Sequence, residues 1–132
     1  MHKKILILLN AYLPPFLWAS VIFLFSSQSQ LPGLSVSMFD FFFKKSAHMF
    51  VYAVFYFLLH RGINFHRYAH LPISQRPHFV TNWWLPFLFT LLYAALDEFH
   101  QMFTPNRYPT IRDVGYDMLG AWVSFLWIYR YI

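Results

Sequence analysis

The stretch ILILLNAYLPPFLWASVIFLF, residues 5–25, decides the class of fold because it holds no charged side chain. A bilayer core about 30 Å thick needs about 20 mainly apolar residues of helix, and this stretch reaches that length. Lys3 and Lys4 precede it, as is typical where a membrane helix meets anionic headgroups. Pro14 and Pro15 should kink it, because proline removes a backbone donor and clashes with the preceding turn. The stretch therefore predicts a kinked transmembrane helix.

Three further apolar segments predict an all-α membrane protein, a bundle of about four transmembrane helices in a single domain over residues 1–132. We expect these helices at residues 5–25, 39–60, 83–103 and 113–131. The second reaches membrane length only if it begins near Phe39, which puts Lys44, Lys45 and His48 within its first turns. The connection from Arg61 to His78 is rich in Arg and His, and we expect a solvated loop there.

The composition suits lipid rather than water. Hydrophobic residues make up 58% of the chain and charged residues 11%, against about 25% charged in ordinary soluble domains. A soluble domain of this size would leave large apolar patches in contact with water.

The absence of cysteine excludes disulfides, thiolate catalysis and Cys-ligated metals. The net charge of +5 comes from basic residues at the ends of apolar runs, which favours anionic lipid surfaces over nucleic acid as partner.

The Lys and Arg residues give a prediction of orientation. Four crossings put both termini on one side of the membrane together with the connection between the second and third helices. That side carries Lys3, Lys4, Arg61, Arg67, Arg76 and Arg130, and the other carries Lys44, Lys45, Arg107 and Arg112. The positive-inside rule therefore favours cytoplasmic termini.

Four polar groups from four places in the sequence fall at the same, outward ends of the predicted helices. They are Ser26-Ser27-Gln28, Lys45 with His48, the run from Asp97 to Gln101, and Asp113 with Asp117. Ionisable side chains near the middle of a membrane helix cost at least about 2.5 kcal/mol each, so they usually face one another or a wet cavity. We therefore expect these groups to converge on one site.

Helical spacing divides these residues into faces, because residues three and four apart share one side of a helix. Asp97, His100 and Gln101 lie together, whereas Glu98 is turned about 100° away. The others form two stripes, one of Lys45, His48 and Tyr52 and one of Asp113, Asp117 and Gly120.

In this order, the polar pieces resemble the VanZ-like membrane proteins, a family named after a protein associated with resistance to the glycopeptide teicoplanin. The matching pieces are Ser26-Ser27-Gln28, Lys45-x-x-His48 followed by Tyr52, Asp97-Glu98-x-x-Gln101 with Pro105 and Arg107, and Asp113 with Gly120. The family often has an acidic residue where Lys44 stands and an asparagine where Asp117 stands, and both departures alter the charge of the site. The resemblance implies a multi-pass envelope protein of the bacterial inner membrane, linked to glycopeptide susceptibility, and leaves its molecular activity open.

The main hypothesis is a cavity, open to the outer face, that binds an anionic lipid-linked or cell-wall-related ligand through charge-assisted hydrogen bonds. Lys45, Arg107 and Arg112 are the candidates to hold the anionic group. The predicted functional cluster comprises Ser27, Gln28, Lys45, His48, Asp97, Glu98, Gln101, Arg107, Asp113 and Asp117. The expected partners are membrane lipids and a lipid-linked envelope precursor.

Three alternatives stay open. The same residues could form a structural network that holds the helices in register. They could form a membrane-embedded hydrolase or transferase that acts on an envelope lipid, with a His or carboxylate as general base. A proton or ion pathway is disfavoured because no ladder of polar groups continues to the other face. A metal site of His48, Asp97, His100 and Asp113 lacks any dense ligand motif, so we expect no metal and no cofactor.

Overall fold

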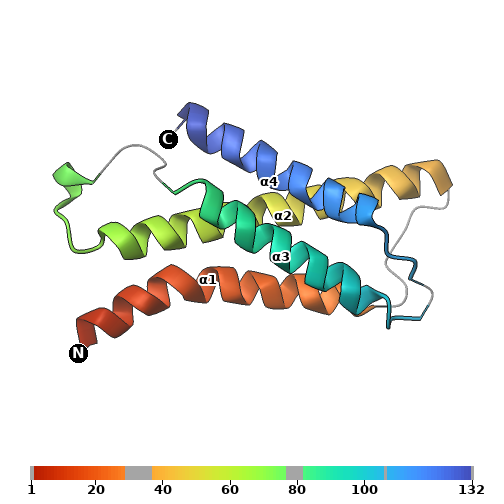
Figure 1. Ribbon diagram of the computed structural model, residues 1–132, viewed down its shortest axis with the longest axis horizontal. Coiled ribbons are helices and arrows are strands. Elements are labelled where there is room, and N and C mark those ends of the chain that lie inside the picture. Colours follow the sequence, from red (N-terminus) through yellow and green to blue (C-terminus); the bar gives the residue numbers. More distant parts are fainter. Residues whose placement is uncertain (1, 29–36, 77–81, 106, 132) are drawn as a thin grey trace.

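The computed structural model describes residues 2–28, 37–76, 82–105 and 107–131 (Figure 1). Within these residues the chain forms four α-helices, one short 3₁₀-helix and no strand. The α-helices are α1 (His2–Ser26), α2 (Ser37–Tyr68), α3 (Trp84–Gln101) and α4 (Ile111–Tyr131), and the 3₁₀-helix is η1 (Ile73–Gln75). The predicted all-α fold is therefore confirmed, and each predicted helical segment falls on one observed helix.

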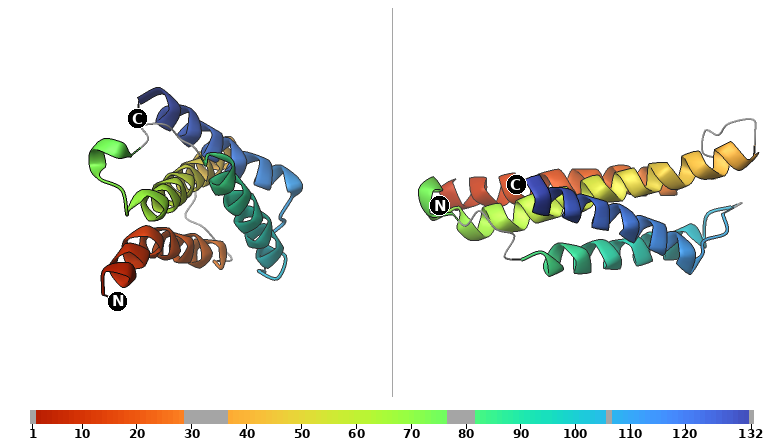
Figure 2. Two further views of the ribbon diagram at one scale, coloured as in Figure 1. Left: turned by 60° about the vertical axis from the view of Figure 1, so that its left-hand side comes forward. Right: turned by 90° about the horizontal axis from the view of Figure 1, so that it is seen from above.

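Helix α2 is the centre of the bundle. It packs against each of the other three α-helices, and its contact with α4 is the most extensive. In the described part of the chain α1 and α4 do not touch, and Figure 2 shows them on opposite sides of α2 with α3 alongside. Every polar residue that α2 contributes can therefore meet partners from several helices.

Two glycines allow close helix crossings on α2. A Cβ at Gly62 would collide with the backbone carbonyl oxygen of Ala11 on α1, and a Cβ at Gly120 on α4 would collide with the carbonyl oxygen of Met49 on α2. Because only glycine leaves room for backbone at such a crossing, the two contacts fix where α1 and α4 meet α2.

Helix α1 is continuous through Pro14 and Pro15. Its axis changes direction in the N-terminal half (Figure 1), where the proline rings remove backbone hydrogen bonds from the preceding turn. The expected proline bend is therefore present.

The predicted loop from Arg61 to His78 is wrong in its first half, because α2 continues to Tyr68. Two of its residues, Arg61 and His66, contact α1 while their side chains remain exposed. The Arg61 guanidinium donates to the backbone carbonyl and side-chain oxygen of Asn10, at 3.3 and 2.7 Å. The Tyr12 hydroxyl lies 2.7 Å from Nδ1 of His66. Residues 77–81 of the predicted loop, with His78, lie outside the described residues.

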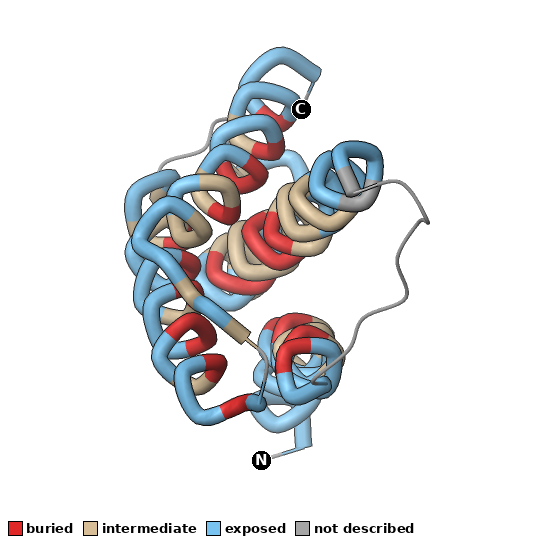
Figure 3. Tube along the Cα trace, turned by 90° about the vertical axis from the view of Figure 1, so that its right-hand side faces the viewer, coloured by how far each residue is buried: buried red, intermediate tan, exposed pale blue. Residues whose placement is uncertain are grey.

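The distribution of side chains is inverted relative to a soluble protein. Large apolar side chains are exposed on the outside of all four α-helices, for example Phe16, Phe50, Leu96 and Leu126. Buried positions include carboxyl and amide side chains, and Asp117 is 0% exposed. In Figure 3 the buried residues lie on the sides of the helices that face one another, and the outer surfaces are exposed.

Helix α1 is the one described helix that is long and apolar enough, by its length and composition, to cross a membrane. Helices α2, α3 and α4 carry more charged and polar residues, among them those described below.

Candidate functional site

One carboxylate oxygen connects three helices. Oδ2 of Asp97 on α3 accepts hydrogen bonds from the Ser26 hydroxyl of α1 at 2.8 Å, the Tyr52 hydroxyl of α2 at 3.3 Å and the Gln101 amide at 3.1 Å. All four side chains are buried. Asp97 and Gln101 meet because residues four apart share a face of the helix, as the spacing predicted.

Helices α2 and α4 meet through the two polar stripes. Lys45 forms an ion pair with Asp113, and one turn further along, Nδ1 of His48 lies 3.1 Å from Oδ1 of Asp117. The next contact in the same direction is the glycine crossing at Gly120. Two residues of each predicted stripe therefore face each other along α2 and α4, whereas Tyr52, the third residue of the α2 stripe, bonds Asp97 of α3.

Asp113 also lies in the first turn of helix α4. Its Oδ2 accepts hydrogen bonds from the backbone N–H and the hydroxyl of Thr110, at 3.2 and 3.0 Å. A carboxylate in the first turn can accept a hydrogen bond from the backbone N–H of the residue before the helix, which would otherwise be unpaired. Its negative charge also interacts favourably with the positive end of the helix dipole. The Lys45 to Asp113 pair is thus anchored to a helix terminus.

Four buried polar atoms of this region have no hydrogen-bond partner among the described residues. They are Asp97 Oδ1, Glu98 Oε2, His100 Nδ1 and Asp117 Oδ2. An unpaired polar atom in a low-dielectric interior is costly, and natural proteins satisfy such atoms with ordered water, a shared proton or a ligand. The region therefore has hydrogen-bonding capacity beyond what its own helices use.

A cavity of about 310 Å³ opens beside this network, between α1 and α2. It is lined by Ile22, Phe25, Ser26, Phe43, Lys44, Ala47, His48, Val51 and Arg107. Two of these residues join the cavity to the buried carboxylates, because Ser26 bonds Asp97 and His48 bonds Asp117. The described wall holds cationic and apolar side chains and no carboxylate.

Arg107, in the connection between α3 and α4, is held across the end of α1. Its Nε donates to the carbonyl of Gln28 at 3.2 Å, and an Nη atom lies 3.5 Å from the carbonyl of Phe25. In the described part of the chain these partners are uncharged carbonyls and not carboxylates. Among the described residues, no ion pair neutralises the positive charge of Arg107 at the rim of the cavity.

The structure pairs six of the predicted cluster residues with one another, namely Lys45 with Asp113, His48 with Asp117 and Gln101 with Asp97. Glu98 is buried between the same helices, although its spacing turns it away from Asp97. Arg107 lines the cavity, and Gln28 contributes its carbonyl.

Ser27 does not lie with these residues in the structure. It is exposed, and its hydroxyl donates to the carbonyl of Phe23 at 2.7 Å within its own helix. Its neighbour Ser26 takes the inward position, and the exposed Arg112 does not line the cavity. Sequence reasoning also missed the apolar wall, because Phe43, Ala47 and Val51 look like any other apolar helix residues until α1 is placed against them.

The described residues do not form a metal site from His48, Asp97, His100 and Asp113. In the part of the chain that the structure describes, no group of three or more His, Cys, Asp or Glu residues is placed to hold a metal ion.

Fold and site together define a class, that of small all-α proteins with a polar, partly charged centre between apolar outer faces. The model of the VanZ/LLP1 family matches residues 9–132, nearly the whole chain, and the protein belongs to this family. No curated protein and no solved structure matches the chain.

Proposed function

We propose that the protein spans the bacterial inner membrane with all four α-helices. Large apolar side chains cover the outside of each helix, and water offers no favourable environment for so much apolar surface. The 18 residues of α3 and the 21 of α4 make helices about 27 and 32 Å long, close to a bilayer core of about 30 Å. Membership of the VanZ/LLP1 family supports an envelope protein.

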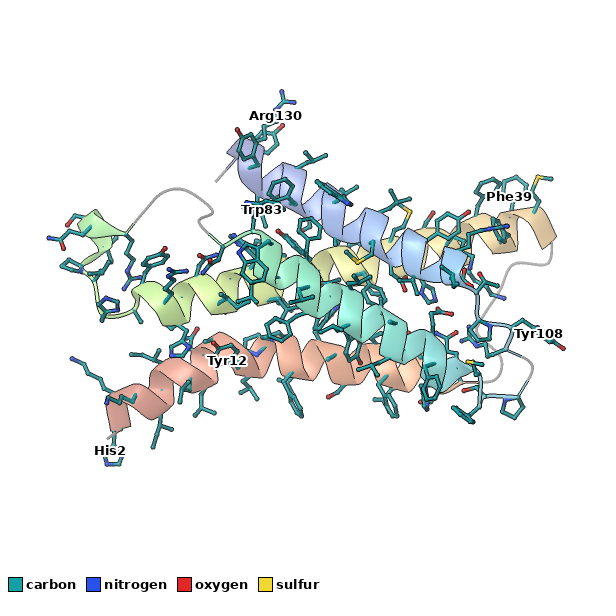
Figure 4. The ribbon with its side chains drawn as sticks, in the orientation of Figure 1. His2, Tyr12, Phe39, Trp83, Tyr108 and Arg130 are labelled. Carbon is teal, nitrogen blue, oxygen red and sulfur yellow. The ribbon has the colours of Figure 1, made fainter. Side chains whose placement is uncertain are left out.

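The proposed orientation has both termini in the cytoplasm. Figure 4 labels His2 and Arg130 toward one end of the bundle and Phe39 and Tyr108 at the other. Six Lys and Arg residues belong to the first end, and the buried carboxylates with their cavity belong to the second. The positive-inside rule then leaves the cavity on the outer side.

The proposed function is binding of an anionic lipid-linked or cell-wall-related ligand in the cavity between α1 and α2. The observation that carries it is the combination of apolar walls with the charge of Arg107 and the imidazole of His48. Lys45 is less suited to this role than the sequence suggested, because Asp113 already neutralises it. A link to glycopeptide susceptibility is part of the proposal and rests on the family alone.

A membrane-embedded hydrolase or transferase is the second candidate. One observation favours it: the Asp117 carboxylate orients His48 through Nδ1, which leaves Nε2 as the nitrogen that could act as general base on a group in the cavity.

The test is mass spectrometry of the lipids that co-purify with the full chain. We expect one anionic lipid to be enriched with the wild type and with Arg112→Ala, and lost with Arg107→Ala. Arg112 is the matched control because it lies in the same region without lining the cavity. Identical lipids in all three samples would refute a specific ligand. Conversion of the enriched lipid by wild type but not by His48→Ala would favour the enzyme.

A further inference from the structure

The cavity is formed by two helices and one residue of a connecting segment. Apart from Arg107, its lining comes from α1 and α2, and no residue of α3 or α4 contributes. Because α3 and α4 pack on other parts of α2, the cavity lies at the side of the bundle and not along its axis. In the proposed orientation, its access is from the lipid beside the α1–α2 pair.

The apolar residues that line the cavity on α2 follow the axis of that helix. Phe43, Ala47 and Val51 follow one another at intervals of four residues, so they form a strip along one side of α2. This strip is about 12 Å long at 1.5 Å per residue, and it starts at the proposed outer end of the helix. A chain on it would run parallel to α2, as the lipid chains of the bilayer do.

The polar groups of the cavity come from different directions. Lys44 and His48 lie one turn apart on α2, and Arg107 reaches the cavity from the connection after α3. Donors carried by two different elements suit a tetrahedral phosphate, whose oxygens point several ways, better than a planar carboxylate. With Nδ1 engaged by Asp117, His48 would meet such a phosphate through Nε2.

The volume limits the apolar part of the ligand. At about 310 Å³ the cavity is at the lower limit of small-molecule sites, which span about 300–1,000 Å³. There is room in it for a phosphate and a short length of one chain.

From these features we propose that the cavity binds a single-chain lipid phosphate, such as an alkyl or prenyl monophosphate, which enters sideways between α1 and α2. The phosphate contacts Arg107 and His48, and the first carbons of the chain lie on the strip from Phe43 to Val51. This inference rests on the proposed function and makes its ligand class specific.

The experiment titrates the purified full chain in non-ionic detergent with four probes, using native mass spectrometry to obtain apparent Kd values. The probes are dodecyl phosphate, inorganic phosphate, dodecanol and a two-chain phosphatidic acid. Dodecyl phosphate should bind at least about tenfold more tightly than each of the other three, because it alone supplies the phosphate and one chain that the cavity fits.

Two pairs of variants separate the headgroup from the chain. Arg107→Ala and Ala47→Phe should each weaken dodecyl phosphate binding by about tenfold, the first by removing a cation and the second by filling the apolar wall. The controls Arg112→Ala and Ser46→Phe make the same changes outside the cavity and should stay within about twofold of wild type. Size-exclusion profiles and thermal unfolding midpoints establish that each variant is folded.

The outcomes distinguish the two proposals. If Arg107→Ala abolishes binding while Ala47→Phe does not, the placement of the chain is overturned and the anionic site of the proposed function stands. Equal binding of phosphatidic acid overturns the restriction to one chain. If inorganic phosphate binds as well as dodecyl phosphate, the ligand is a free anion and not a lipid. If no probe binds the wild type, while an anionic lipid still co-purifies in an Arg107-dependent way, only the inferred ligand class fails.

Discussion

At the scale of single residues, Asp97 is the side chain on which the packing of three helices depends. Asp97→Ala removes the acceptor of three buried hydrogen bonds and leaves their donors unpaired. We expect a loss of roughly 2 kcal/mol in the free energy of unfolding, from three bonds at about 0.6 kcal/mol each in a membrane bundle. Denaturant titration of the detergent-solubilised protein measures it. Asp97→Asn keeps an acceptor oxygen and should lose clearly less, so equal losses for the two variants would contradict the assignment.

The Lys45 to Asp113 ion pair gives a second prediction at this scale. The two side chains are 25% and 16% exposed, so solvent screens their attraction only in part. A double-mutant cycle of Lys45→Met with Asp113→Asn should give a coupling energy of about 1 kcal/mol. The same cycle with Arg112→Met in place of Lys45→Met is the control, since Arg112 makes no ion pair with Asp113 in the described part of the chain. Equal coupling in both cycles would argue against a specific pair.

The sequence predicted which residue types gather at the site, but not the rotation of every helix. Helical spacing put Lys45 with His48 on one face of α2 and Asp113 with Asp117 on one face of α4, and these two faces meet in the structure. It was not enough to choose between Ser26 and Ser27, which differ by about 100° around α1. The choice depends on how α1 sits against α2 and α3, and that is set by tertiary contacts such as the Gly62 crossing.

At the scale of secondary-structure elements, the contact between α2 and α4 depends on Gly120. Gly120→Ala introduces a Cβ that collides with the Met49 carbonyl, so the helices must move apart. We expect a loss of about 2 kcal/mol, in the range of overpacked cores. Gly115→Ala on the same helix is the control, because nothing lies within 4 Å of its Cβ. It should leave stability unchanged or raise it by up to about 1 kcal/mol, through higher helix propensity. Loss of stability in Gly115→Ala alone would reverse the assignment of the two glycines.

The end of α2 illustrates what hydropathy patterns do not capture. Residues after His60 are polar enough to suggest a loop, yet they continue the helix because α1 supplies them with partners. Asn10 and Tyr12 are inconspicuous within the apolar stretch of α1, and their role appears only when the two helices lie together. The end of α2 therefore depends on contacts with residues of α1, which lie 51 and 54 residues earlier in the chain and outside any short stretch of sequence used to predict a helix.

At the scale of the whole molecule, the separation of charge along the bundle predicts its orientation. The chain has no cysteine, so single cysteines can report exposure without background. In right-side-out membrane vesicles, an impermeant maleimide should label Tyr108→Cys and not Ser74→Cys, and both should react after permeabilisation. Both positions are exposed on the protein surface, which makes them a matched pair. Labelling of Ser74→Cys alone in intact vesicles would put the cavity on the cytoplasmic side.

The unequal lengths of the helices have a consequence for the surrounding membrane. Helix α3 is about 27 Å long, whereas the 32 residues of α2 extend over about 48 Å. In the proposed membrane arrangement, α3 is close to the thickness of the bilayer core, whereas α2 extends beyond the core with its polar end from Arg61 to Tyr68. In that arrangement a change in acyl-chain length alters the match between α3 and the bilayer core, so the energy of the protein depends on membrane thickness.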